Sequence, residues 1–195
     1  MALAETLVRP STFLAPETLP VAAPLDGLFP YGGLVRGSLV TVDSLTVALT
    51  LLAATSAVGG WCAVAGIPDL GLAAAADAGI DLHRFVVVPT PGEQWAVTIA
   101  TLLDGVGLVL ARPPARLKSS DARRLAARTR ERRAVLLVNG TWPEQVDLRI
   151  HLDGSEWTGL SDGYGRLLRR RTDLTASGRG AAARERRVTA WLPGC

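Results

Sequence analysis

The chain is poor in the residues that build covalent or metal-bound scaffolds. It has two cysteines and two histidines in 195 residues. Cys62 lies in an apolar run and Cys195 is the last residue, so their spacing predicts neither a disulfide framework nor a zinc site. His83 and His151 have no metal-ligating or catalytic companion at a useful spacing. We therefore expect no metal and no cofactor, and the two thiols suit a reducing cytoplasm.

The sequence also lacks signals for export or membrane insertion. Its N-terminal residues have no basic flank, apolar centre or small-residue cleavage site of a secretory signal. Residues 45–68 carry no charge and are long enough to span a bilayer. Gly59 and Gly60 interrupt them, however, so a buried helix followed by a buried strand is the better interpretation. We expect a cytoplasmic protein with no membrane partner.

Basic residues are scarce in the first part of the chain and abundant in the second. Residues 1–110 contain three arginines and nine acids, a net charge of −6, whereas residues 111–195 contain 18 basic residues and nine acids, a net charge of +9. A basic half of this kind serves nucleic acid or an acidic protein surface, or it forms solvated helix and strand faces. The composition leaves these alternatives open.

Apolar runs that suit fully buried strands alternate with helical stretches from residue 37 onward. We expect strands at 38–42, 61–65, 85–88, 107–111 and 134–138, and helices at 45–57, 70–78, 93–103 and 120–132. After residue 139 we expect only strands, at 146–152, 165–177 and 187–192, with Gly178 and Gly180 at a hairpin tip. The pattern predicts an α/β fold with a mostly parallel sheet flanked by helices and with C-terminal antiparallel strands.

Proline divides the chain into an arm and a domain. The first 24 residues contain four prolines among scattered apolar side chains, which predicts an extended N-terminal arm, 1–24, outside the core. The remaining residues, 25–195, are enough for one core and short for two. We therefore expect one domain over 25–195.

Several motifs in order resemble the RecA recombinase core. The stretch LDGLFPYGGLVRGSLVTV, residues 25–42, is similar to the RecA segment that leads into the nucleotide-binding strand. The Gly-Ile-Asp turn at 79–81 and the Pro-x-x-Gly-Glu-Gln stretch at 89–94 follow in the same order as in that family. The resemblance covers most of residues 25–194 and implies a RecA-like domain.

The residues that make RecA-like proteins ATPases are missing. Such enzymes need a Gly-rich loop that cradles phosphates, a lysine on the phosphates, and Ser or Thr on magnesium. Here the turn after the first strand is only Asp43-Ser44-Leu45-Thr46, without glycine, and the sole lysine, Lys118, lies far downstream. Asp43 places a negative charge where phosphates would lie, and Asp43 or Ser44 is well suited to cap the next helix.

Three more positions depart from what the resemblance implies. Arg112 stands in place of a magnesium-associated Asp, Gly66-Ile67-Pro68 in place of a water-activating Glu, and Gly140 in place of a nucleotide-sensing Gln. We therefore expect no catalytic residue, no ATP binding and no enzyme activity. The second DNA-binding loop of RecA would fall at 140–145, which is too short to span nucleotides in the same way.

A small RecA-like chain with a lost phosphate loop and an Arg-rich tail resembles the ImuA-type proteins of actinobacteria. In that family the protein works in DNA damage-induced mutagenesis beside ImuB, an inactive relative of Y-family polymerases, and an error-prone C-family polymerase. The resemblance implies a non-catalytic adaptor in error-prone translesion synthesis with such protein partners. The alternative is a module that binds DNA independently of sequence through the Arg-rich half.

Eight arginines on the expected terminal hairpin are the candidate contacts for DNA or a protein partner. They are Arg166, Arg169, Arg170, Arg171, Arg179, Arg184, Arg186 and Arg187. Strand alternation places Arg169 and Arg171 on one face and Arg170 on the other. Arginines at this density can contact phosphates without reading sequence, but charge on a sheet edge also serves to resist strand addition. We expect Trp95, Trp142, Trp157 and Trp191 in the core or at its rim.

Overall fold

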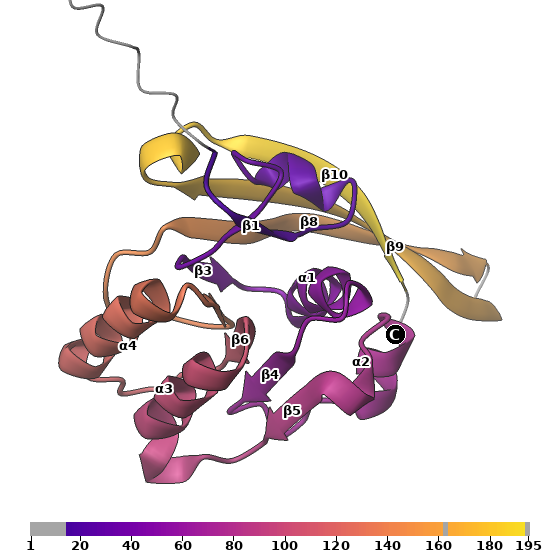
Figure 1. The fold of residues 1–195 in the computed structure, drawn as a ribbon. Helices are drawn as coiled ribbons and strands as arrows, with labels where there is room; N and C mark the ends of the chain where they lie inside the picture. Colours follow the sequence, from indigo (N-terminus) through magenta and orange to yellow (C-terminus); the bar gives the residue numbers. More distant parts are fainter. Residues whose placement is uncertain (1–14, 162–163, 194–195) are drawn as a thin grey trace, which may run out of the picture.

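A computed structural model describes residues 15–161 and 164–193 of the chain. One eight-stranded sheet has the order β10-β9-β8-β3-β7-β6-β4-β5 (Figure 1). Its parallel strands are β3 (Leu39–Val42), β4 (Cys62–Ala65), β5 (Phe85–Val88), β6 (Leu108–Ala111), β7 (Val135–Val138) and β8 (Leu148–Ser161). Two antiparallel strands, β9 (Tyr164–Gly178) and β10 (Arg186–Pro193), complete it. The predicted α/β fold with C-terminal antiparallel strands is confirmed.

The central strands are apolar throughout because both faces of the sheet are covered. Every residue of β4, β6 and β7 is buried, which explains the continuous Val, Leu and Ala of these segments. Helices α1 (Leu45–Ala57) and α2 (Leu72–Asp77) cover one face, and α3 (Trp95–Gly105) and α4 (Ser119–Arg132) cover the other (Figure 1). The carboxyl ends of the parallel strands meet at one edge, where ligands bind in open α/β sheets.

Helix α1 accounts for the long uncharged segment of the sequence. It packs on the sheet and also contacts β1 and β10, so apolar residues occur on more than one of its sides. The strand β4 follows it, which confirms the expected buried helix and buried strand over residues 45–68. Within the described residues, no helix is long and apolar enough to cross a membrane.

The described end of the expected N-terminal arm belongs to the domain, which differs from the prediction. Strand β1 (Thr18–Pro20) pairs antiparallel with β2 (Gly33–Val35), and Leu19 is buried in the core. Glu17 lies 2.7 Å from Arg36 Nε and 2.7 Å from Arg133 Nη2, and these ion pairs hold the segment against the body. The inward side chain of Leu19 anchors this three-residue strand, and Pro20 at the strand end does not prevent the pairing with β2. Residues 1–14 lie outside the described part of the chain.

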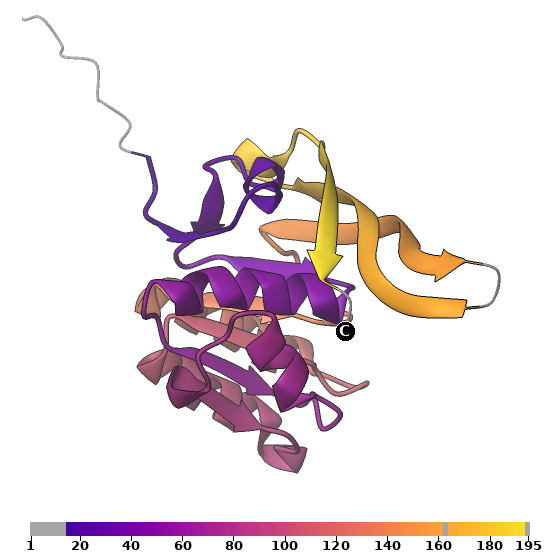
Figure 2. The same cartoon turned by 90° about the vertical axis from the view of Figure 1, so that its right-hand side faces the viewer.

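Strand β8 is much longer than its apolar pattern suggests. The prediction ended it at residue 152, before Asp153 and Gly154, whereas it runs to Ser161 with irregular register at Leu152/Gly154 and Thr158/Leu160. Pairing with β9 carries it past these turn-forming residues. The far part of the β8–β9 hairpin extends beyond the α/β body (Figure 2).

In the described ranges, four short 3-10 turns connect these elements. They are η1 (Leu25–Leu28), η2 (Leu82–Arg84), η3 (Gly92–Gln94) and η4 (Gly180–Ala182). Turn η1 buries Leu25 and Leu28 and packs against β10. Turn η4 follows Gly178, so Gly178 and Gly180 mark the connection between β9 and β10, as predicted.

Candidate functional site

The turn between β3 and α1 is capped by the chain's own residues. Ser44 is the N-cap of α1, and its Oγ accepts a hydrogen bond from the backbone N–H of Val47 at 3.4 Å. Asp43 does not cap the helix. Its carboxylate accepts hydrogen bonds from the backbone N–H of Leu152, at 3.1 and 3.2 Å, and pairs with Nδ1 of His151. The turn is therefore tied to strand β8.

Asn139 links the ends of three neighbouring strands at the same edge of the sheet. It follows β7, is buried, and its Nδ2 donates to the carbonyl oxygens of Val42 at 3.0 Å and Asp43 at 3.3 Å. Its Oδ1 accepts from Nε and Nη2 of Arg112, at 3.2 and 2.9 Å. Arg112 follows β6, and its Nη1 lies 3.1 Å from Oδ1 of Asp69. The guanidinium of Arg112 is thus already bound by oxygen atoms of Asn139 and Asp69.

Gly66, the first residue of the stretch 66–68 where a water-activating acid was implied, has no room for a side chain. Gly66 has φ of +76°, and a Cβ there would lie 2.5 Å from the carbonyl oxygen of Arg112. The same oxygen accepts a hydrogen bond from Trp95 Nε1 at 2.8 Å. Close packing between the ends of β4 and β6 therefore requires glycine at this position.

We call the polar groups at this edge the carboxyl-edge network. Its members are Asp43, Asp69, Arg112, Asn139 and His151. They come from the ends of β3, β4, β6, β7 and from β8, and they bind one another directly. Three features oppose a bound triphosphate here: a carboxylate at the N-terminus of α1, a helix cap supplied by serine, and an arginine engaged by protein oxygens.

The arginines of the terminal hairpin divide between two faces, as predicted. In the register of the sheet, Arg170 lies between Trp157 and Leu192, on the face that carries buried Leu174. Arg169 and Arg171 are exposed on the opposite face, and Arg171 pairs in register with the exposed Trp191.

Carboxylates and carbonyl groups engage several of these arginines. Arg171 lies 3.7 Å from Glu156, Arg179 2.6 Å from Asp147, and Arg187 2.8 Å from Glu185. Arg186 Nη1 donates to the carbonyl oxygen of Arg184 at 3.1 Å. In the part of the chain that the structure describes, Arg169 and Arg184 have no carboxylate within ion-pair distance. The side chain of Arg166 lies outside the described residues.

A family model described as the MT3502 N-terminal domain matches residues 27–144, which is more than half of the chain. The chain belongs to this family. The uncharacterized protein Rv3395c of Mycobacterium tuberculosis (strain ATCC 25618 / H37Rv) is 41% identical over 96 residues. That match covers 48% of this chain and 47% of the relative, so it spans about half the length of each protein.

The MT3502 N-terminal domain match separates the two candidate regions. It includes Asp43, Asp69, Arg112 and Asn139, and it ends before β8 and the terminal arginines. The carboxyl-edge network is therefore mostly inside the matched region. The hairpin arginines lie outside it.

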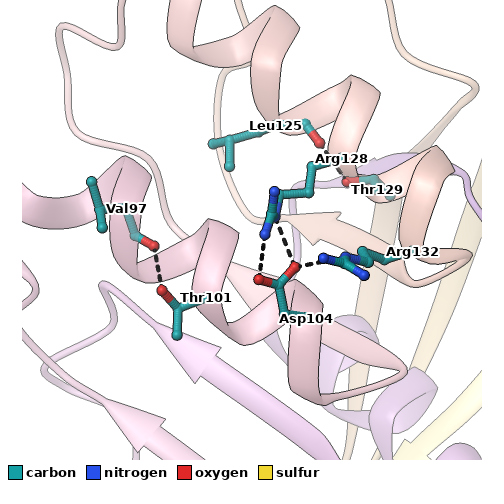
Figure 3. Close-up of polar contacts among 7 residues, drawn as sticks. All are labelled: Val97, Thr101, Asp104, Leu125, Arg128, Thr129 and Arg132. Atoms are coloured by element: carbon teal, nitrogen blue, oxygen red, sulfur yellow. Dashed lines mark hydrogen bonds and ion pairs between the residues drawn. The ribbon is translucent and has the colours of Figure 1, made fainter.

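Helix α4 of the MT3502 N-terminal domain carries a second group of arginines. Arg128 Nε donates to Asp104 of α3 at 2.8 Å, and Arg132 Nε donates to it at 3.0 Å (Figure 3). The hydrogen bond from Arg128 is the main cause that lowers the pKa of Asp104 from its ordinary value. These arginines dock α4 on α3, which favours the structural interpretation of this basic helix over a partner site.

Sequence reasoning missed the residues that act across long separations. His151 was set aside for lack of companions, yet it meets Asp43. Asn139 carried no sequence signal beyond its place directly after an expected strand. Two of the four tryptophans expected in the core or at its rim, Trp95 and Trp142, are buried, whereas Trp157 and Trp191 are exposed.

Proposed function

We propose that this chain is a non-catalytic adaptor with a RecA-like fold that binds a protein partner in error-prone translesion synthesis. One observation carries the non-catalytic part: Arg112, Asn139 and Asp43 are joined where a RecA-like ATPase would hold nucleotide. The resemblance to ImuA-type proteins supports the process and the partners, an ImuB-like relative of Y-family polymerases and an error-prone C-family polymerase complex.

The chemistry of the network supports the absence of turnover in this proposal. ATP hydrolysis needs a phosphate cradle, a metal-binding oxygen and an acid or base beside the attacking water. Asp43 would repel phosphate, and its carboxylate is already bonded to the backbone of Leu152. At Gly66, the neighbouring carbonyl of Arg112 leaves no space for an acidic side chain.

Nucleotide binding tests the non-catalytic part directly. The protein is titrated with a fluorescent ATP analogue in the presence of magnesium, and phosphate release is followed with and without single-stranded DNA. A RecA ATPase serves as the positive control. We expect neither saturable binding nor release above background, and DNA-stimulated phosphate release would contradict the proposal.

Partner binding tests the adaptor part. The chain is co-expressed with an ImuB-like relative of Y-family polymerases, and the mixture is separated by size-exclusion chromatography. We expect co-elution at equal stoichiometry that survives nuclease treatment. Failure of the two proteins to co-elute would contradict the adaptor role.

A specific arrangement favours DNA binding as the second candidate. Arg169, Arg171 and the exposed Trp191 lie on one face of the hairpin, and arginines beside an aromatic ring can hold single strands. The acids Glu156 and Asp173 share that face, which weakens its attraction for phosphate.

Charge reversal separates the two candidates. Arg169, Arg170 and Arg171 are replaced by glutamate, and retention of single-stranded DNA is measured at low salt. Replacement of Arg123, Arg124 and Arg130, three exposed arginines of α4, by glutamate is the matched control for general loss of basic charge. DNA binding that falls only in the hairpin variant would favour the second candidate, whereas equal retention in all three proteins would exclude it.

A further inference from the structure

The β8–β9 hairpin leaves part of one strand edge without a neighbour. Strand β3 pairs with β8 only from Leu148 to Ile150, because β3 ends at Val42. On the other side, β9 pairs with β8 as far as Ser161. Among the described residues, no strand lies beside β8 on the β3 side from Gly154 to Thr158. We call this stretch the open edge, and Figure 2 shows the hairpin that carries it beyond the body.

The open edge is regular and weakly protected. Register irregularities at Leu152/Gly154 and Thr158/Leu160 flank it, and its five residues pair with β9 without interruption between them. It contains no proline and no lysine, the residues that commonly block strand addition, and Glu156 is its single charge. An unpaired row of backbone N–H and C=O groups matches another extended peptide chain.

A tryptophan held in place lies within the open edge. Trp157 is 41% exposed, and the guanidinium carbon of Arg170 is 5.6 Å from the centre of its ring. Arg170 Nη2 donates to Oγ of Ser155 at 2.9 Å, and its Nε is buried without a hydrogen-bond partner. Stacking and the Ser155 bond fix the arginine under the ring, so the indole is a pre-ordered apolar platform. Trp and Arg are the residues enriched in the energetic centres of protein interfaces.

The opposite face of the same stretch carries one carboxylate, Glu156, beside Arg169 and Arg171 of β9. Glu156 is 79% exposed, and its contact to Arg171 is long, at 3.7 Å. It is therefore able to receive a second cation. Trp157 and Glu156 are adjacent, so their side chains lie on opposite faces of the strand. A strand added here would meet an apolar surface on one face and a carboxylate on the other.

We propose that the open edge, Gly154 to Thr158, binds an extended segment of a protein partner as an added β-strand. The segment places an apolar side chain on Trp157 and a basic side chain beside Glu156. A protein fits better than a nucleic acid because the edge offers peptide groups for a hydrogen-bond ladder, and the only charge among its own five residues is the carboxylate of Glu156. This inference names the docking surface of the adaptor and so rests on the proposed function.

A short synthetic probe tests the surface without the natural partner. The peptide acetyl-Lys-Val-Lys-Val-Lys-amide alternates apolar and basic residues, and acetyl-Lys-Pro-Lys-Pro-Lys-amide has the same charge but cannot pair as a strand. Amide exchange of the full chain is measured by NMR with each peptide at about 1 mM, a concentration suited to weak binding. We expect slower exchange at residues 154–158 with the valine peptide only.

Two variants and a control locate the contact. Trp157→Ala should lower the affinity for the valine peptide by at least about tenfold, the loss expected for an interface anchor. Trp157→Phe should retain most of the affinity, and Trp61→Ala, at another exposed tryptophan just before β4, should leave it unchanged. No protection with the valine peptide, or equal protection with the proline peptide, would overturn the proposal.

The remaining outcomes separate this surface from the adaptor role. Protection of residues 154–158 by a single-stranded oligonucleotide, without protection by the peptide, would overturn the proposal in favour of nucleic acid. If the polymerase-like protein co-elutes equally with wild type and Trp157→Ala, the adaptor stands and the surface is overturned. If that protein does not co-elute while the peptide protects the edge, the surface stands and the proposed function fails.

Discussion

Replacing Asn139 by alanine is the sharpest test of the carboxyl-edge network. The side chain donates to the carbonyl oxygens of Val42 and Asp43, and its Oδ1 accepts two hydrogen bonds from Arg112. Hydrogen bonds to charged groups contribute about 1.5–3 kcal/mol, and a buried carbonyl that loses its donor costs about 1–3 kcal/mol. Arg112 is partly exposed and keeps Asp69, so water recovers some of this loss. We expect Asn139→Ala to lower the free energy of unfolding by about 2–4 kcal/mol.

Thermal unfolding followed by circular dichroism measures this loss. For a chain of this size, 1 kcal/mol shifts the melting temperature by about 2–4 °C, so we expect a decrease of roughly 4–16 °C. Thr141→Ala is the matched control, because Thr141 is exposed in the same connection and should change stability by less than about 0.5 kcal/mol. If Asn139→Ala melts within about 1 °C of the control, the network does not stabilise the edge as argued.

Three other perturbations follow from the structure. Burial raises the pKa of Cys62 to about 12. In a variant with the other cysteine replaced by serine, we therefore expect no reaction with a thiol reagent at pH 8 until denaturant is added. Rapid reaction of the native protein would contradict this. Asp104→Asn should lower the melting temperature at pH 7. Because the pKa of Asp104 in the native protein lies below its ordinary value, the difference from wild type should shrink as the pH falls through that lowered pKa. A difference that does not depend on pH, or the same effect in the control Asp77→Asn, would refute the ion-pair explanation. Gly66→Ala should lower the free energy of unfolding, measured in urea, by about 2 kcal/mol or more, because of the positive φ and the clash of the added Cβ. Gly71→Ala, at an ordinary φ, is the control, and equal stability of the two variants would refute the steric argument.

The sequence was sufficient to predict the parallel core, because each buried strand is a continuous apolar run. The bounds of α1 and β5 match the prediction residue for residue, and the other helices differ by a few residues at their ends. The length of β8 was not predictable, since Asp153 and Gly154 favour a turn and only pairing with β9 overrides them. Leu19 was missed for a similar reason, because β1 has three residues and only its partner β2 defines it.

The sequence predicted which residues the candidate site lacks by comparison with RecA-like ATPases, and it did not predict the contacts that the site contains. The missing glycines, lysine and acids are visible in the chain, so the altered edge could be anticipated. The contacts of Asn139 with Val42 and of Asp43 with Leu152 join residues about a hundred positions apart, and no local pattern encodes such pairs. The hairpin faces followed from strand alternation, but the carboxylate partners of the arginines did not.

The bond from Leu152 N–H to Asp43 has a consequence for any chain that pairs with β8. Where β3 ends, the Asp43 carboxylate takes the place of a backbone carbonyl and accepts the next hydrogen bond along the strand. A strand arriving at the open edge meets this occupied position and can extend no further toward β3. For the proposed added strand, Asp43 would therefore limit how far it reaches along β8, and the turn between β3 and α1 would act as the end stop of a docking ladder.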